Sequence, residues 1–174
     1  MAEFTAYNCQ YQWIDSETVT SENAEELFAD VSGILVPGGF GHRGIEGKIE
    51  AIRYARHPQY PVPWSLSRNA AFHCGIARDV IGYKDAHSME LNPDTTHPVI
   101  HIMEDQIGIE DIGGTLRLGS YPCVLKEDSL AYRLYGTKEI HERHRHRYEV
   151  NNDYREVLEA NGMSLCGLLR TAGS

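Results

Sequence analysis

A glycine-rich turn between two apolar segments, within residues 33–56, restricts the fold of this chain more than any other stretch. Ile-Leu-Val at residues 34–36 is a short apolar run, which predicts a strand covered on both faces. Pro37 ends the run, and the glycines of residues 38–41 can adopt positive φ and point free N–H groups at negative charge. From Ile45 the apolar side chains recur at helical spacing. This order is typical of the ligand-binding edge of an α/β sheet, and the alternative is a simple connecting turn.

The composition predicts one soluble domain. The chain has 174 residues, of which 41% are apolar, and no apolar stretch approaches the length needed to span a bilayer. Its start at Met1 shows no basic segment followed by an apolar run, so we expect a cytoplasmic location. The net charge of −9 disfavours nonspecific binding to nucleic acid or anionic membrane. The cysteines form no Cys-x-x-Cys pair, which predicts reduced thiols and no zinc ribbon.

Three long segments, in the right order, resemble one protein family. They are residues 33–56, Gly-Gly-Thr-Leu-Arg-Leu-Gly at 113–119, and Glu-Arg-His-Arg-His-Arg-Tyr-Glu-Val-Asn-Asn at 142–152. Together they resemble the class I glutamine amidotransferase half of CTP synthase. The resemblance implies an α/β, flavodoxin-like fold, which we expect to be incomplete at both ends. It further implies that residues 1–174 are a partial glutamine amidotransferase domain, with the synthetase domain absent.

The resemblance assigns roles to four residues of a glutamine site. Backbone N–H groups near Gly39 and Phe40 are implied to hold the oxyanion, and Glu90 is implied to contact the ammonium group of glutamine. Arg147 is implied to help hold the α-carboxylate. Without the resemblance, Glu90 would be interpreted as a solvated loop carboxylate and Arg147 as part of a solvated charged strand.

The nucleophile of the family is missing from the aligned position. The family motif is Gly-x-Cys-x-Gly-x-Gln, whereas residues 64–70 are Trp-Ser-Leu-Ser-Arg-Asn-Ala. Leu66 stands at the nucleophile position and cannot attack an amide, and Arg68 replaces a glycine at the sharp turn. Cys74 lies eight residues later, or roughly 12 Å along a helix, and is expected to be a small buried apolar side chain.

The other catalytic groups of the family are a His and a Glu in a His-Pro-Glu motif, which does not occur in these residues. We therefore expect this chain to be catalytically inactive, with glutamine binding weakened or lost. No cofactor is expected in this chain; ATP and Mg belong to the synthetase half, a possible partner. The alternatives are a noncatalytic binding or docking module and a metal site built from His141, His144 and His146.

Further elements are predicted from local patterns. Residues 9–14 alternate like a strand, and residues 99–103 and 121–125 also predict strands. Three helix caps are expected, at Ser21, Ser129 and Asn152. The helix after Ser129 is expected to end at Tyr135, the last helix is expected to end near Gly162, and a strand is expected to begin at Leu165.

Residues 57–76 and 168–174 are out of register with the family, and our hypothesis is that a frame change in the gene produced both. Residues 59–75 can be encoded so that the same nucleotides, started one nucleotide later, give Asn-Ile-Pro-Phe-Leu-Gly-Leu-Cys-Leu-Gly-Met-Gln. That string contains the missing nucleophile motif. Sequencing the encoding DNA is expected to show these codons; codons that cannot encode Gly-Leu-Cys-Leu-Gly in the neighbouring frame would exclude the frame change.

Overall fold

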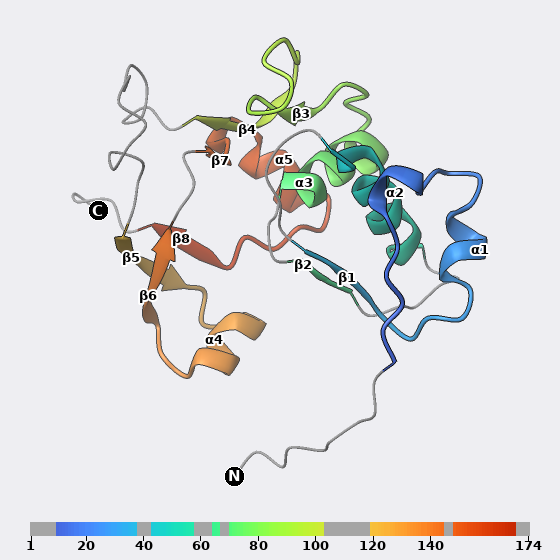
Figure 1. Ribbon diagram of the computed structural model, residues 1–174. Helices are drawn as coiled ribbons and strands as arrows, with labels where there is room; N and C mark the ends of the chain where they lie inside the picture. Colours follow the sequence, from blue (N-terminus) through green and yellow to red (C-terminus); the bar gives the residue numbers. More distant parts are fainter. Residues whose placement is uncertain are drawn as a thin grey trace. The chain divides into compact units, whose positions relative to one another are not determined.

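Figure 1 shows the computed structural model of the chain, which describes residues 10–37, 43–57, 64–66, 70–102, 119–144 and 148–169. The chain divides into two compact units, residues 1–67 and residues 68–174. Each unit is described by itself below.

The first unit contains short helices and a pair of parallel strands. Its elements are the 3-10 helix η1 (Ser16–Thr18), α1 (Ala24–Phe28), β1 (Ile34–Val36), α2 (Ile45–Ala55) and β2 (Trp64–Leu66). β1 and β2 pair in parallel, with Ile34 opposite Trp64 and Val36 opposite Leu66. The predicted strand at residues 34–36 and the helix from Ile45 are therefore confirmed.

An apolar cluster between α1 and α2 forms the core of this unit. The rings of Phe28 and Tyr54 have centroids 5.3 Å apart, and Val19, Ala24 and Ala51 are buried beside them. Full burial of a large apolar side chain contributes about 1.5–3 kcal/mol. Burial of this cluster therefore stabilises the packing of α1 on α2. α2 also packs against β1 and η1, which fixes the helix that follows the glycine turn.

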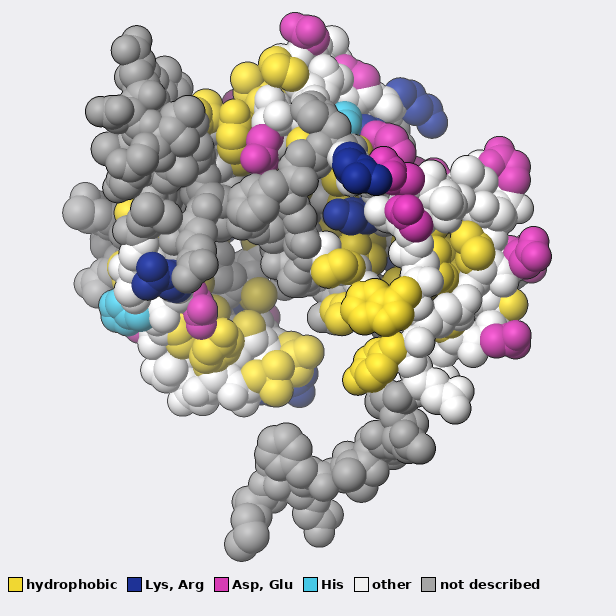
Figure 2. Space-filling view, in the orientation of Figure 1, with side chains coloured by type: hydrophobic (Ala, Val, Ile, Leu, Met, Phe, Trp, Pro, Cys, Tyr) yellow, Lys and Arg dark blue, Asp and Glu magenta, His cyan; other side chains and the backbone are white. Residues whose placement is uncertain are grey.

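Two sequence predictions for this unit are wrong. Residues 10–14 form no strand, and the side chain of Trp13 is 92% exposed. An alternating pattern gives a strand only where a neighbour supplies hydrogen bonds, and no described strand pairs with this segment. β1 is not covered on both faces either, since Leu35 is 69% exposed. Figure 2 shows hydrophobic side chains at the surface; the largest exposed ones in this unit are Tyr11, Trp13 and Leu35.

The cap of α1 also differs from the prediction. Asn23, not Ser21, precedes the helix, and its side-chain oxygen accepts a hydrogen bond from the Thr20 N–H at 2.8 Å. The Ser21 hydroxyl instead donates to Glu22 Oε1 at 3.0 Å. The helix is thus preceded by a turn held by polar side chains. Thr, Ser and Asn can all form such local hydrogen bonds, so the sequence alone does not show which of them is the cap.

The second unit contains more elements. Its helices are α3 (Ala70–Ile76), the π-helical turn η2 (Ala77–Ile81), α4 (Leu130–Tyr135), the 3-10 helix η4 (Asn152–Tyr154) and α5 (Arg155–Ala160). Its strands are β3 (His87–Ser88), β4 (Pro98–Ile102), β5 (Gly119–Leu125), β6 (Glu139–His144), β7 (Tyr148–Val150) and β8 (Gly167–Leu169). The described strands form two three-stranded sheets, ordered β3-β4-β7 and β6-β5-β8. β3 and β4 are parallel, and the other pairs are antiparallel.

Buried apolar side chains join the helices of this unit to its first sheet. Leu158 of α5 is fully buried and packs with Ile76 and Met163, and Val99 of β4 is also fully buried. α3 packs against β3 and β4. This packing stabilises β4, which is the central strand of the sheet β3-β4-β7.

The predicted strands at residues 99–103 and 121–125 and most helix ends of this unit are confirmed, whereas the strand expected from Leu165 begins at Gly167. β4 and β5 include the described parts of the predicted strands. Ser129 caps α4, because its hydroxyl accepts from the Tyr132 N–H at 3.1 Å. The final cap is Asn151, not Asn152: its side chain accepts from the Asp153 N–H at 3.1 Å, and a 3-10 turn precedes α5.

Gly47 provides a test of the packing between α2 and η1. Gly47→Ala would favour a helix locally, but a Cβ on Gly47 would lie 1.7 Å from the Ser16 carbonyl oxygen. We expect a loss of about 1–3 kcal/mol in the free energy of unfolding, measured by urea titration. Lys48→Ala in the same helix is the control and is expected to change this free energy by less than about 0.5 kcal/mol. Equal effects of the two changes would contradict the close approach.

Candidate functional site

Two parallel strand ends define the first candidate region. Val36, the last residue of β1, lies opposite Leu66, the last residue of β2. The glycine turn follows β1, and α3 begins at Ala70 after β2. Leu66 therefore occupies a strand end that precedes a helix, which is where a nucleophile elbow places its reactive residue. A leucine at this point supplies no nucleophilic atom.

Several predicted residues lie outside the described part of the chain. Gly39 and Phe40 of the glycine turn are among them, as are Arg68 and Arg147. The oxyanion geometry at Gly39 and Phe40 and the carboxylate contact of Arg147 stay predictions.

Glu90 lies on a tight turn that follows β3. Its side chain is exposed, and its backbone N–H donates to the Ser88 hydroxyl oxygen at 3.3 Å. The Ser88 carbonyl oxygen accepts from the N–H groups of Leu91 at 3.0 Å and Asn92 at 2.9 Å. The Met89 N–H donates to the Ile100 carbonyl oxygen at 2.9 Å, which attaches the turn to β4. The carboxylate of Glu90 is thus presented to solvent from a hydrogen-bonded backbone.

A carboxylate clamp holds the loop between β3 and β4. Asp85 Oδ2 accepts from the Thr96 N–H at 2.6 Å and from the Thr96 hydroxyl at 2.7 Å. The Thr95 hydroxyl donates to the Asp85 carbonyl oxygen at 2.7 Å. The Thr96 hydroxyl, followed by the Thr96 N–H, lowers the pKa of Asp85 below its ordinary value. The clamp closes residues 85–96 into a loop with the Glu90 turn inside it.

An aromatic cluster supports the base of this loop. The rings of Tyr83 and His97 are stacked with centroids 4.0 Å apart. The Tyr154 hydroxyl lies 3.4 Å from His97 Nδ1, and the Tyr154 ring meets the Tyr83 ring edge-on. Burial is the main cause that raises the pKa of Tyr154. The cluster connects the start of the loop, its end and η4.

The sheet β3-β4-β7 brings the Glu90 turn and the start of β7 to one edge. β3 and β4 run in parallel and β7 runs antiparallel to β4, so the ends of β3 and β4 and the start of β7 share an edge (Figure 1). Glu90 comes two residues after β3, and Arg147 is the residue before Tyr148, which lies opposite Ile102. The side chain of Arg147 is outside the described residues, so this edge is defined by the Glu90 turn and the start of β7.

The other candidate residues do not form a reactive site. Cys74 is 1% exposed within α3, as expected for a small buried side chain. Arg143 and His141 lie on β6, while Arg145 and His146 are outside the described residues. Among the residues that the structure describes, no three His, Cys, Asp or Glu side chains are placed to hold a metal ion.

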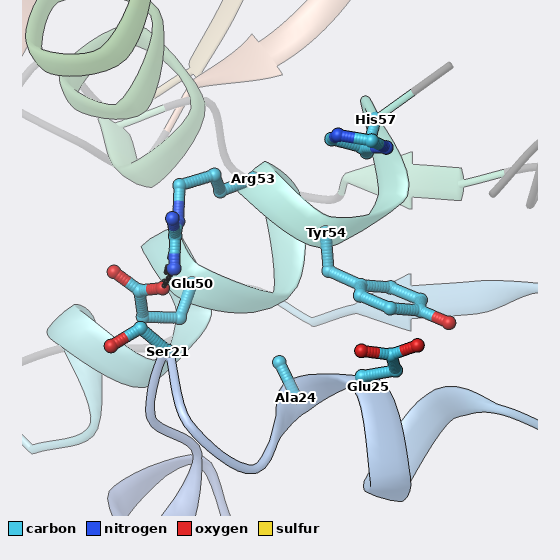
Figure 3. Close-up of a pocket in the computed structure, with 7 residues that line it drawn as sticks. All are labelled: Ser21, Ala24, Glu25, Glu50, Arg53, Tyr54 and His57. Carbon is cyan, nitrogen blue, oxygen red and sulfur yellow. Dashed lines mark hydrogen bonds and ion pairs between the residues drawn. The ribbon is translucent and has the colours of Figure 1, made fainter. Parts of the chain in front are cut away.

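A surface pocket between α1 and α2 has none of the predicted glutamine-site residues in its lining. Its volume is about 170 Å³, and its lining is Ser21, Ala24, Glu25, Glu50, Arg53, Tyr54 and His57. Figure 3 shows Arg53 and Glu50 facing each other, with Arg53 Nε 2.8 Å from Glu50 Oε2. An exposed ion pair of this kind contributes about 0–1 kcal/mol, and it neutralises the positive charge in the pocket.

The hydrogen bonds in and around the Glu90 turn were not predicted from the sequence. Ser88 and the Asp85–Thr96 clamp act through contacts between backbone and side chains. Ser88 has a recognisable signal, since a serine before a turn often accepts a hydrogen bond from an N–H two residues later. The pairing of Asp85 with Thr96 has no such signal, because it depends on how the loop closes.

Comparisons with known proteins point to the same family that the sequence motifs resemble. Residues 2–63 match the family model described as "Glutamine amidotransferase class-I". The CTP synthase of Staphylococcus saprophyticus is 56% identical over 158 residues, which cover 91% of this chain and 30% of that protein. The chain is therefore similar to the class I glutamine amidotransferase part of CTP synthases. The CTP synthase of Staphylococcus carnosus is 56% identical over 157 residues, which cover 90% of this chain and 29% of that protein.

A solved structure supports the same assignment. The glutaminase domain of the Trypanosoma brucei CTP synthase, with bound acivicin, matches with a TM-score of 0.82 at 31% identity. The match covers 91% of this chain and 61% of that chain. The flavodoxin-like amidotransferase fold is therefore confirmed, and the chain spans about a third of the length of the curated CTP synthases it resembles. No helix of the described residues is long and apolar enough to cross a membrane.

Acidification is expected to loosen the Asp85 clamp of this chain. Its folded-state pKa lies below the ordinary value of about 4, so the clamp stabilises the loop above that pH and is lost as the pH falls through the lowered pKa. NMR hydrogen exchange is expected to show a protection factor for the Thr96 N–H that is constant above about pH 5 and falls as the pH is lowered below about 4. Asp85→Asn should remove this dependence. A protection factor that stays constant in the unaltered chain would contradict the clamp.

Proposed function

We propose that this chain is a glutaminase-type module of CTP synthase that recognises glutamine without hydrolysing it. The observation that carries the proposal is Leu66 at the end of β2, opposite Val36 and ahead of α3. Amide hydrolysis by this family's route needs a thiolate at that point, and leucine supplies none.

Recognition of glutamine needs different groups from hydrolysis. The exposed carboxylate of Glu90 would accept hydrogen bonds from the substrate ammonium, and Arg147 would bind the α-carboxylate. The support for this pairing is the shared edge of the β3-β4-β7 sheet, at which the Glu90 turn follows β3 and β7 begins one residue after Arg147 in the sequence. The family resemblance assigns the oxyanion contacts to backbone N–H groups at Gly39 and Phe40.

The wider role is that of the CTP synthase family. There, ammonia from glutamine is used by a synthetase domain that consumes ATP with Mg to convert UTP to CTP. We propose such a synthetase domain as the partner of this module, in the cytoplasm. The support is the identity of 55–56% to curated CTP synthases, of which this chain matches about a third.

Glutamine binding and ammonia release test the two halves of the proposal. Titration calorimetry of the purified chain with glutamine is expected to show saturable binding, while an ammonia assay on the same sample shows no release above buffer. Glu90→Gln removes a charge-assisted hydrogen bond and is expected to weaken binding by about tenfold or more. Glu156→Gln, which changes an exposed carboxylate of α5, is the control and should bind as the unaltered chain does.

The ammonia assay and the titration distinguish hydrolysis, contamination and loss of binding. Saturable ammonia release that disappears in Glu90→Gln would show hydrolysis at this site and overturn the inactive assignment. Release that persists unchanged in Glu90→Gln would come from a contaminating enzyme. Absence of glutamine binding in the unaltered chain would overturn the recognition half.

A further inference from the structure

We propose that Ser88 is the positioning residue that fixes the Glu90 carboxylate for the ammonium group of the ligand. The inference rests on the proposed function, because the role of Glu90 toward glutamine belongs to that proposal. What it adds is a residue that determines how strongly the site distinguishes an α-amino acid from the same molecule without its amino group.

Ser88 is built into the sheet on one side and into the turn on the other. It pairs with Ile100 of β4, and its side chain is only 1% exposed. Its hydroxyl oxygen accepts from the Glu90 N–H at 3.3 Å, and its carbonyl oxygen accepts from the N–H groups of Leu91 and Asn92. The N–H groups of three successive residues, Glu90 to Asn92, therefore all donate hydrogen bonds to Ser88.

The hydroxyl is the group that fixes Glu90 itself. The bonds to Leu91 and Asn92 use the carbonyl of Ser88 and would survive a change of side chain. The bond to the Glu90 N–H would not, because alanine offers no acceptor. Met89 on the preceding position is already held by the Ile100 carbonyl oxygen, so loss of the hydroxyl loosens the backbone at Glu90 specifically.

The position of Glu90 matters because its side chain is exposed and otherwise free to rotate. A carboxylate that accepts from an ammonium gains most when its backbone is already in place, since less conformational entropy is lost on binding. The Asp85–Thr96 clamp closes the surrounding loop through hydrogen bonds between Asp85 and Thr96, so it does not replace the bond from the Glu90 N–H to the Ser88 hydroxyl.

The test compares two ligands that differ only at the ammonium. These are glutamine and 4-carbamoylbutanoate, which is glutamine without its α-amino group. Titration calorimetry on the full 174-residue chain gives the ratio of their affinities. Ser88→Ala is expected to reduce the preference for glutamine by about two- to tenfold, the effect of one hydrogen bond, and to leave 4-carbamoylbutanoate binding unchanged. Ser88→Thr, which keeps the hydroxyl, should restore the preference.

Ser129→Ala is the matched control. Ser129 is another buried serine whose hydroxyl accepts from a backbone N–H at the start of a turn, at 3.1 Å from the Tyr132 nitrogen. A general loss of stability would act on both ligands alike and would follow either serine change. A loss confined to glutamine and to Ser88→Ala identifies positioning of Glu90.

Hydrogen exchange supplies a second measurement that does not need a ligand. The Glu90 N–H is expected to exchange faster in Ser88→Ala than in the unaltered chain, and to be unaffected in Ser129→Ala. A Ser88→Ala variant with unchanged ligand preference, or with unchanged exchange at Glu90, would overturn the inference. If the unaltered chain binds neither ligand, the proposed function fails, and exchange at Glu90 alone then supports or overturns the role of Ser88.

Discussion

Parallel pairing of neighbouring strands is the constraint on which both candidate regions depend. Strands that run in one direction end at the same edge of a sheet, so the residues that follow them meet there. In residues 1–67 this pairing places Val36 and Leu66 opposite each other. In residues 68–174 it places the turn after β3 at the edge where β4 ends and β7 begins. The chemistry available at each edge then depends on the side chains found there.

The scaffold of the first unit does not depend on the chemistry of its strand end. β1 and β2 are joined by backbone hydrogen bonds, and α2 is held by the cluster around Phe28 and Tyr54. None of these contacts requires a thiol at residue 66. A strand followed by a helix can therefore persist where the nucleophile is absent, which is why the fold alone does not establish the activity.

Sequence patterns predicted the helices, strands and caps that depend on interactions between residues close together in the sequence. The apolar run at residues 34–36, the helical spacing after Ile45 and the cap at Ser129 were all predictable, because neighbours in sequence settle them. The alternation of polar and apolar residues at 9–14 led to a wrong strand prediction. A strand needs a neighbouring strand to hydrogen-bond with, and the sequence alone does not identify one. The oxyanion and arginine residues were found through family resemblance. The Asp85–Thr96 clamp could not be found, since its members are brought together only when the loop closes.

Recognition and hydrolysis of glutamine draw on different parts of this chain. The residues proposed to bind the ammonium and the α-carboxylate belong to residues 68–174, whereas Leu66 and the glycine turn belong to residues 1–67. The turn that carries Glu90 is fixed by its own bonds to Ser88 and β4, none of which involves residue 66. A change at the nucleophile position removes the bond-breaking step without removing a single contact that holds Glu90. Loss of hydrolysis is therefore physically compatible with retained recognition of the amino-acid end of glutamine.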